Sequence, residues 1–156
     1  MALAPDGTIF VADGYGNHLV HKFSPEGELL LTWGQQGTGP GEFGTVHNIT
    51  VDQESRVYIC DRSNDRIQVF DREGQFLEQW ELPSPNDIWI QDDIAYVAGG
   101  THWVSLWTLD GEVLARFGSR DEGVPAPGHG ICVDAHGSIY AIGNQRVTKF
   151  KRVSQS

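Results

Sequence analysis

The sequence has few cysteines and no long apolar segment. Its two cysteines, Cys60 and Cys132, can form at most one disulfide, so the chain is not a disulfide-stapled scaffold. No apolar run approaches the ~18 residues that a membrane-spanning helix requires, and the N-terminus lacks the pattern of a signal peptide. We therefore expect a soluble chain with no membrane partner. The sequence does not indicate its compartment.

Basic residues are also scarce. The 156 residues include 11 Lys and Arg against 21 Asp and Glu, which gives a net charge of −10. An acidic chain repels the phosphate backbone of nucleic acids, and we find no local Lys/Arg cluster that would offset this repulsion. The charge therefore argues against nucleic acid as a partner.

The residues that are abundant favour β-structure. The chain has 19 Gly, 7 Pro, 5 Trp and 7 Phe, so turns are frequent and residues suited to pleated sheets are common. With 39% hydrophobic residues it can also bury a core. The composition predicts an all-β protein.

One pattern recurs four times along the chain: a short apolar strand, an acidic turn, a β-branched or aromatic strand, and a strand that ends in an aromatic residue. These aromatic residues recur about every 40 residues, at Phe23, Phe70, Trp107 and Phe150. Four-stranded repeats with this period predict a β-propeller, with repeats at about 1–34, 47–81, 86–118 and 129–153. A β-sandwich is the alternative, although sandwiches lack such repetition. A further aromatic residue ends the last strand of three repeats and is interpreted as packing: Trp33, Trp80 and Phe117.

The first and last repeats look incomplete. The first begins with a shortened strand, and the fourth shows no last strand after Phe150. An open arc of blades exposes unpaired sheet edges. We therefore expect residues 1–156 to form one propeller segment of about four blades. It would be an incomplete arc of a six-bladed type within a longer chain, or a propeller closed by homo-oligomerisation.

Two strand junctions carry a family resemblance. Residues 57–70, which read Val-Tyr-Ile-Cys-Asp-Arg-Ser-Asn-Asp-Arg-Ile-Gln-Val-Phe, and residues 13–23 resemble NHL-repeat propellers. Within that superfamily the chain looks particularly close to the peptidyl-α-hydroxyglycine α-amidating lyases, which cleave peptidyl-α-hydroxyglycine to a peptide amide and glyoxylate. The similarity is densest at Phe23-Ser24-Pro25, Trp33-Gly34, Pro40-Gly41-Glu42-Phe43 and His47.

The resemblance implies a six-bladed propeller whose channel holds a catalytic Zn²⁺ through three histidines from alternate blades. His47 and His129 match two of these histidines, and the third would lie in a blade before Met1. Tyr15 matches the active-site tyrosine, thought to act as a base, and Arg62 matches an arginine that holds the substrate carboxylate. The implied partner is a small peptide or another carboxylate-bearing substrate, and Ca²⁺ is a weaker candidate than Zn²⁺.

The same residue types also suit this chemistry when the family resemblance is set aside. Imidazoles on inner strands can converge on Zn²⁺, and the planar donor fork of Arg62 suits a carboxylate. A phenol such as that of Tyr15 is a weak base unless a metal ion or a cation stabilises the phenolate. Structural interpretations stay open: the histidines can serve turns, Tyr15 can cover the channel mouth, and Arg62 can pair with an acid such as Asp65.

Two other functions compete with the lyase. NHL propellers commonly serve as binding platforms, which predicts a non-catalytic module that binds a protein partner. Related six-bladed propellers hydrolyse lactones with a channel Ca²⁺. Asn86, which takes the place of the metal histidine in the third repeat, is the residue suited to that site, but no clear set of carboxylates accompanies it.

Overall fold

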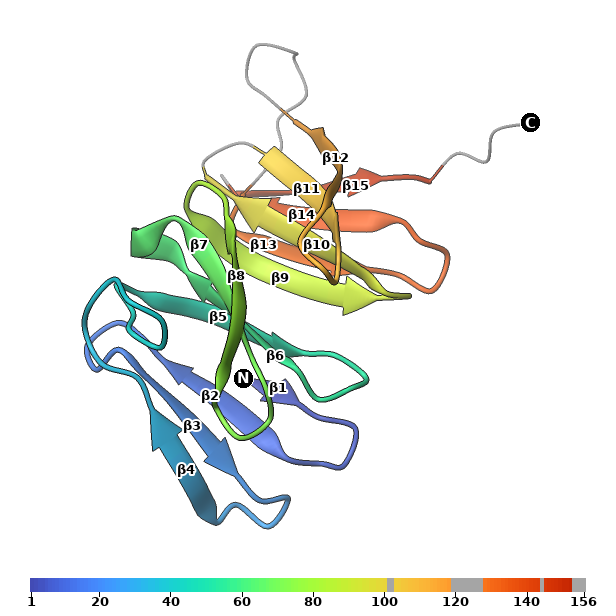
Figure 1. Ribbon diagram of the computed structural model, residues 1–156. Coiled ribbons are helices and arrows are strands. Elements are labelled where there is room, and N and C mark those ends of the chain that lie inside the picture. The colour runs from blue at the N-terminus through green and yellow to red at the C-terminus, as the bar shows by residue number, and fades with distance from the viewer. Residues whose placement is uncertain (101–102, 119–127, 144, 153–156) are drawn as a thin grey trace. The chain divides into compact units, whose positions relative to one another are not determined.

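The structure is a computed structural model that describes residues 1–100, 103–118, 128–143 and 145–152 (Figure 1). The chain divides into two compact units, an N-terminal unit of Met1–Pro85 and a C-terminal unit of Asn86–Ser156. No helix within the described residues is long and apolar enough to cross a membrane. Cys60, which is buried, and Cys132, which is exposed, are both free thiols.

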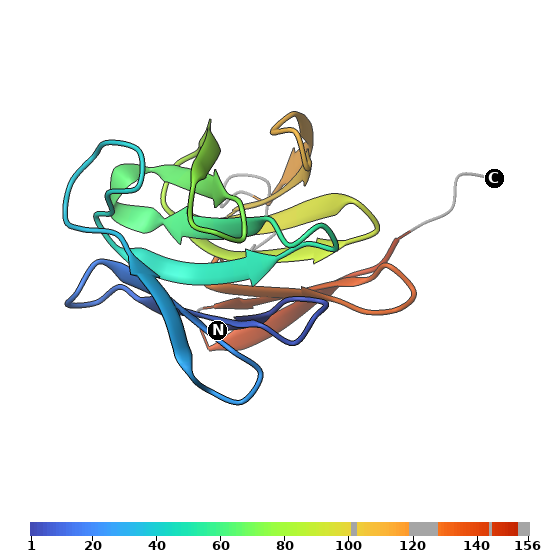
Figure 2. The same cartoon turned by 60° about the horizontal axis from the view of Figure 1, so that its bottom comes forward.

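The N-terminal unit consists of two four-stranded antiparallel sheets with neighbouring strands in chain order (Figure 2). A single-turn 3-10 helix, η1 (Arg62–Asn64), connects two strands of the second sheet. The first sheet contains β1 (Ala2–Leu3), β2 (Ile9–Asp13), β3 (Leu19–Phe23) and β4 (Leu29–Trp33), and the second contains β5 (Val46–Val51), β6 (Val57–Asp61), β7 (Arg66–Phe70) and β8 (Phe76–Glu81).

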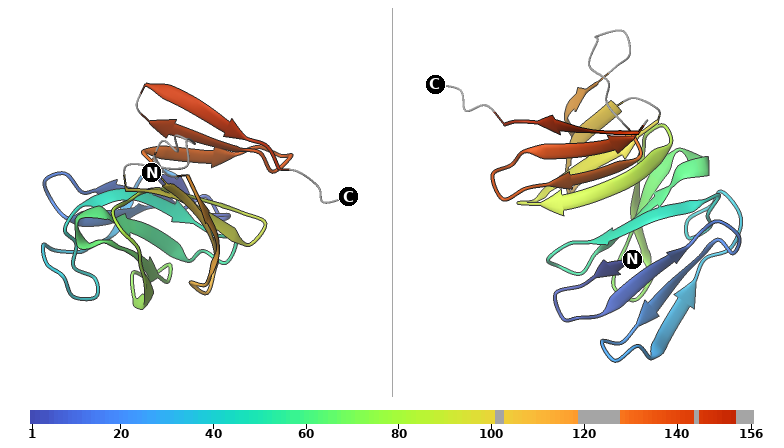
Figure 3. Two further views of the ribbon diagram at one scale, coloured as in Figure 1. Left: turned by 90° about the horizontal axis from the view of Figure 1, so that it is seen from above. Right: turned by 180° about the vertical axis from the view of Figure 1, so that it is seen from behind.

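The C-terminal unit holds one four-stranded sheet and, within the described residues, one three-stranded sheet (Figure 3). Their strands again pair in chain order and antiparallel, so the all-β fold expected from the repeat is confirmed. The third sheet contains β9 (Pro85–Gln91), β10 (Ile94–Gly99), β11 (Trp103–Thr108) and β12 (Val113–Phe117), and the fourth contains β13 (Gly130–Val133), β14 (Ile139–Gly143) and β15 (Arg146–Phe150).

Tight turns join the strands where the sequence shows an acidic residue or a histidine before glycine. In the turns that lead into β4 and β8, Gly27 has φ 89° and Gly74 has φ 75°. Backbone in this left-handed region suits glycine because a Cβ would clash there. The repeated dipeptides therefore set the strand order by fixing where each hairpin closes.

The core of the N-terminal unit lies between its two sheets and is centred on aromatic rings. Phe70 is only 1% exposed. Its ring centroid lies 5.9 Å from that of Trp33, 6.0 Å from that of Phe43 and 5.9 Å from that of Phe76. Trp80 is buried against Tyr58, at 5.5 Å between centroids. The repeated aromatic residues thus pack as expected.

The C-terminal unit repeats this arrangement with smaller residues. Its core joins Tyr96, Ala98 and Val104 of the third sheet to strands β13 and β14 of the fourth. Phe117 and Phe150 pack against this cluster, and their ring centroids lie 5.0 Å apart. Phe117 therefore takes the position that Trp33 has in the first sheet, as the repeat predicted.

We expect Phe70→Ala to lower the free energy of unfolding by about 3–5 kcal/mol, because it empties the centre of the N-terminal core. Leu77→Ala is the matched control, since Leu77 is 49% exposed on the outer strand of the same sheet and should cost less than about 1 kcal/mol. Urea unfolding followed by tryptophan fluorescence measures both. Equal losses for the two variants would contradict the placement of the core.

Candidate functional site

Tyr15 lies in the loop between β2 and β3 and is 77% exposed. The residue before it, Gly14, is buried, and a Cβ built there would lie 2.0 Å from the carbonyl oxygen of Val46. The backbone of this loop therefore rests directly on the start of β5. Only glycine permits so close an approach, and it brings Tyr15 beside the residue that follows Val46.

That following residue, His47, lies at a β-bulge. Val46 pairs with Asp61 and Asn48 with Cys60, so His47 is the extra residue of β5 between two consecutive partners on β6. A bulge bends the strand and redirects a side chain, and bulges are common next to active sites. The imidazole is partly buried, and its direction is set by the irregular pairing rather than by regular alternation.

Arg62 is the first residue of η1, directly after β6. Its backbone N–H donates to the carbonyl of Thr45 at 3.0 Å, which joins the turn to the chain just before β5. No ion pair involves its guanidinium within the described residues. The alternative partner, Asp65, instead accepts a hydrogen bond from the backbone N–H of Ser84 at 2.8 Å.

These three residues meet at one end of the N-terminal unit. The ring centroids of Tyr15 and His47 lie 5.8 Å apart with an interplanar angle of 59°. The guanidinium carbon of Arg62 lies 5.7 Å from the Tyr15 ring centroid, within the range of a cation–π interaction. A phenol, an imidazole and a permanent cation thus face one another, which is a set that can bind an anion and move a proton.

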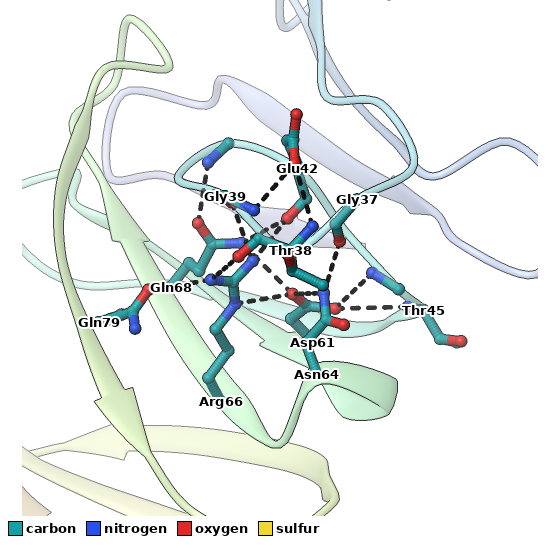
Figure 4. Close-up of polar contacts among 12 residues, drawn as sticks. Gly37, Thr38, Gly39, Glu42, Thr45, Asp61, Asn64, Arg66, Gln68 and Gln79 are labelled. Carbon is teal, nitrogen blue, oxygen red and sulfur yellow. Dashed lines mark hydrogen bonds and ion pairs between the residues drawn. The ribbon is translucent and has the colours of Figure 1, made fainter.

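A buried ion pair holds the backbone that carries this cluster (Figure 4). Asp61 is fully buried, and its Oδ2 accepts from Nε of Arg66 at 2.9 Å and from Nδ2 of Asn64 at 2.8 Å. Its Oδ1 accepts from the backbone N–H groups of Gly44 at 2.8 Å and Thr45 at 3.3 Å. The carboxylate therefore fixes both η1 and the chain that enters β5.

Arg66 uses all five of its N–H donors. Besides Asp61, its guanidinium donates to three backbone carbonyls of the loop before β5 and to the side chain of Gln79, namely Thr38 at 2.8 Å, Gly39 at 2.9 Å, Glu42 at 2.9 Å and Gln79 Oε1 at 3.0 Å. Figure 4 shows the guanidinium at the centre of these acceptors. These loop carbonyls lie outside the strands, and Arg66 supplies their hydrogen-bond donors instead.

Carboxylates stabilise the two loops that border the cluster. The amide N–H of Gly39, the side chain of Gln35 and the N–H of Thr38 all donate to Glu42, and they hold the pKa of its carboxyl below the ordinary value. In the Tyr15 loop, a hydrogen bond from Asn17 lowers the pKa of Asp13. Both groups are therefore charged near neutral pH and keep their loops closed.

His129 lies in the C-terminal unit, directly before β13, and is exposed. Its backbone N–H donates to Ile142 at 3.0 Å. Nearby, Asp87 accepts from the backbone N–H of Ile131 at 2.7 Å, which anchors β13 to β9. Burial raises the pKa of Asp87, while those backbone hydrogen bonds and the charge of His129 act in the opposite direction.

Asn86 has a structural role in the same unit. It is 7% exposed, and its Nδ2 donates to the carbonyls of Gly100 and Gly128. The amide thereby links the end of β10 to the segment before β13. This use of Asn86 gives no support to the Ca²⁺ hydrolase alternative.

The structure thus brings together three of the four residues singled out from the sequence: Tyr15, His47 and Arg62. The fourth, His129, belongs to the other unit, and neither unit by itself tests its pairing with His47. No group of three or more His, Cys, Asp or Glu side chains that could hold a metal ion occurs among the residues that the structure describes. A catalytic zinc normally takes three protein ligands, so the described residues do not complete such a site.

Sequence reasoning missed the residues that place the cluster. Neither Arg66 nor Gly14 was singled out from the sequence. The Asp-x-x-Asn-x-Arg of residues 61–66 was a usable signal, since an aspartate and an arginine across a hairpin can form a buried pair. Nothing in the sequence marked Gly14 apart from the other 18 glycines.

A family comparison agrees with the fold and covers the cluster. The family model of the six-bladed β-propeller DUF5128 matches residues 3–104, which include Tyr15, His47 and Arg62. The chain belongs to this family of six-bladed β-propellers. The four sheets of the described residues therefore correspond to blades of such a propeller.

Individual relatives support the NHL-repeat character of these blades. The chain is 42% identical over 77 residues to NHL repeat-containing protein 3 of Homo sapiens, a match that covers 47% of this chain and 22% of the relative. It is 39% identical over 79 residues to peptidyl-glycine alpha-amidating monooxygenase A of Xenopus laevis, covering 47% of this chain and 8% of the relative. The matches thus span about a fifth or less of the length of these relatives.

A solved structure shows the same fold at low identity. Hydrazine synthase of Kuenenia stuttgartiensis superposes with a TM-score of 0.75 at 17% identity, over 96% of this chain and 44% of that chain. At this identity the likeness concerns the fold alone.

We expect Arg66→Ala to destabilise the protein by about 3–5 kcal/mol, because it removes the cation paired with the buried Asp61 carboxylate and the donor to three loop carbonyls. Arg62→Ala is the matched control from the same hairpin, and its loss should stay within about 0.5 kcal/mol. Urea unfolding measures both variants. A stable Arg66→Ala protein would show that the loop does not depend on this ion pair.

We expect Gly14→Ala to shift the Tyr15 loop away from β5 and to cost about 2 kcal/mol or more, because the added methyl group meets the Val46 backbone. Gly16→Ala, two residues further on, is the control, since a Cβ there has no atom within 4 Å. The aromatic proton resonances of Tyr15, which report the His47 ring current, should move in the first variant only. Identical spectra for both variants would contradict the proposed close approach.

Proposed function

We propose that the Tyr15–His47–Arg62 cluster forms part of the substrate site of a lyase of the amidating type, which cleaves peptidyl-α-hydroxyglycine to a peptide amide and glyoxylate. The observation that carries this proposal is the convergence of these three side chains from separate loops. The sequence resemblance implies that each of them corresponds to a functional position of the amidating lyases. Similarity to an amidating monooxygenase from Xenopus laevis adds support.

In the proposed reaction, Arg62 and Tyr15 have separate roles toward the substrate. Arg62 binds the carboxylate of the hydroxyglycine through its planar donor fork. Tyr15, whose ring lies beside the guanidinium of Arg62, accepts the proton of the substrate hydroxyl. The C–O bond then becomes a carbonyl as the C–N bond breaks, the electron pair moves to nitrogen, and the nitrogen takes up a proton. No oxidant or reductant is needed.

We propose His47 and His129 as contributors to a Zn²⁺ site, with further ligands from outside the described residues. Imidazole suits zinc better than it suits Ca²⁺, which prefers oxygen ligands. No step of the reaction above is assigned to the metal, because the residues present do not complete its coordination. Equilibrium dialysis of wild-type protein and His47→Ala tests the metal proposal separately from activity.

A non-catalytic platform is the second candidate, and the exposure of the cluster favours it. Tyr15 is 77% exposed beside the guanidinium of Arg62, and tyrosine and arginine are enriched where proteins bind partners. Such a platform would hold a carboxylate-bearing peptide without changing it. NHL repeat-containing protein 3 of Homo sapiens shares this type of repeat.

Release of glyoxylate from a synthetic peptidyl-α-hydroxyglycine, with Zn²⁺ supplied, tests the lyase. We expect Tyr15→Phe to lower kcat by about 10²-fold or more, since the phenyl ring cannot accept the hydroxyl proton. Arg62→Ala should raise KM by about tenfold through loss of a charged hydrogen bond. The control is Arg72→Ala, a surface arginine that pairs with Asp6 at 2.7 Å, and it should leave both constants unchanged.

Absence of glyoxylate with the wild-type chain overturns the lyase proposal. Calorimetry with a glycine-extended peptide then examines the platform, because Arg62→Ala should abolish that binding too. Equal activity of wild type and Tyr15→Phe would remove Tyr15 from the reaction.

A further inference from the structure

Two hydroxyl groups form an ordered pair beside the Tyr15–His47–Arg62 cluster. Thr45 Oγ1 and Ser63 Oγ lie 2.7 Å apart, within hydrogen-bond distance. Thr45 comes two residues before His47 on the chain that enters β5, and Ser63 follows Arg62 in η1. Along the chain, the pair therefore adjoins two of the three residues of the cluster.

Backbone contacts hold this pair in place. The N–H of Thr45 donates to Asp61 Oδ1 at 3.3 Å, and the carbonyl of Thr45 accepts from the N–H of Arg62 at 3.0 Å. A Cβ built on Gly44 would lie only 2.9 Å from the Cβ of Ser63, so η1 rests directly on the chain that enters β5. Groups that are fixed in advance lose less entropy when a ligand binds to them.

The pair has hydrogen-bonding capacity left for a ligand. Each hydroxyl has one proton and two lone pairs, and the bond between the two hydroxyls uses one proton and one lone pair. Ser63 is exposed and Thr45 is partly buried, so a ligand can reach the groups that remain. Because hydroxyls both donate and accept, they match the C=O and N–H of a peptide group, and they offer neither a charge nor an apolar pocket for a side chain.

A peptide can span the distance between the pair and the guanidinium of Arg62. That guanidinium is at the tip of a long side chain and faces the ring of Tyr15, whereas the hydroxyl of Ser63 is close to its own backbone. An extended chain advances by at most about 3.6 Å per residue. A peptide whose terminal carboxylate binds Arg62 therefore needs only one or two further residues to reach the hydroxyls.

We propose that Thr45 and Ser63 bind the backbone of a peptide substrate, N-terminal to the residue whose carboxylate binds Arg62, and thereby favour peptides over small carboxylates. This inference rests on the proposed role of Arg62 as the carboxylate anchor. The peptide group is common to all residues, so the selection is for chain length and not for a particular side chain. The hydroxyls act on affinity and take no part in the proton transfer assigned to Tyr15.

A purely structural role for the pair has a different experimental signature. Hydroxyls that only tie η1 to the chain entering β5 would act through the position of Arg62, and their loss would weaken every carboxylate ligand alike. Hydroxyls that bind the peptide affect only the ligands that are long enough to reach them. The ratio of the affinities for a long and a short ligand therefore separates the two roles.

Titrations of the full chain with acetylglycine and with the capped tripeptide acetyl-Ala-Ala-Gly test the proposal, with the Tyr15 ring resonances followed by NMR. We expect the tripeptide to bind more tightly than acetylglycine. Thr45→Val and Ser63→Ala should each weaken binding of the tripeptide by roughly two- to tenfold, as expected for the loss of one hydrogen bond. Both variants should leave the affinity for acetylglycine unchanged.

Two further variants serve as controls. Thr45→Ser keeps a hydroxyl at the same place and should retain the affinity for the tripeptide. Ser24 follows β3, at the opposite end of that strand from the Tyr15 loop, and its Oγ accepts from the backbone N–H groups of Glu26 and Glu28. Ser24→Ala should therefore change neither affinity. Circular dichroism and the thermal midpoint establish that each variant is folded.

Arg62→Ala distinguishes failure of this inference from failure of the proposed function. It should weaken the binding of both ligands. If it weakens neither, or if the wild-type chain binds neither ligand, the carboxylate site is overturned and the inference with it. If Arg62→Ala weakens both ligands while Thr45→Val and Ser63→Ala leave the tripeptide affinity unchanged, only the inference is overturned. Equal losses for both ligands in those two variants assign the hydroxyls a structural role and overturn it as well.

Discussion

The buried pair of Asp61 and Arg66 is the constraint on which the candidate site depends. One carboxylate accepts hydrogen bonds from η1 and from the chain entering β5, and one guanidinium holds three carbonyls of the loop between the first two sheets. A buried ion pair adds little stability by itself, because both charges must lose their water. Its effect here is to hold the loop in one geometry, since every donor of Arg66 has an acceptor there.

The fold was predictable from the sequence because it depends on features that recur. Three features repeat: the aromatic residues at the strand ends, the acidic residue before glycine in the turns, and the period of about 40 residues. A wrong assignment in one repeat is therefore corrected by the others. The strand order of each sheet follows directly. The family resemblance likewise led to Tyr15, His47 and Arg62, whose contacts the structure shows.

The support of that cluster was not predictable, because it depends on single, non-recurring contacts. Arg66 bonds to carbonyls 24 to 28 residues away, and a backbone carbonyl leaves no mark in a sequence. The bulge at His47 depends on the register between β5 and β6, which no residue type signals.

Two arginines of one hairpin have different roles. Arg66 belongs to the buried ion pair, and Arg62 belongs to the candidate site. Arg66 points into the protein, where its surroundings use every donor, and it is 4% exposed. Arg62 lies on the turn that Arg66 and Asp61 hold in place, and its guanidinium faces Tyr15 instead of an acid. A binding residue must keep its hydrogen-bond donors for a ligand. Its backbone must therefore be held in place by a neighbouring residue. In this hairpin the buried pair of Asp61 and Arg66 therefore fixes the backbone, and the guanidinium of Arg62 remains beside Tyr15.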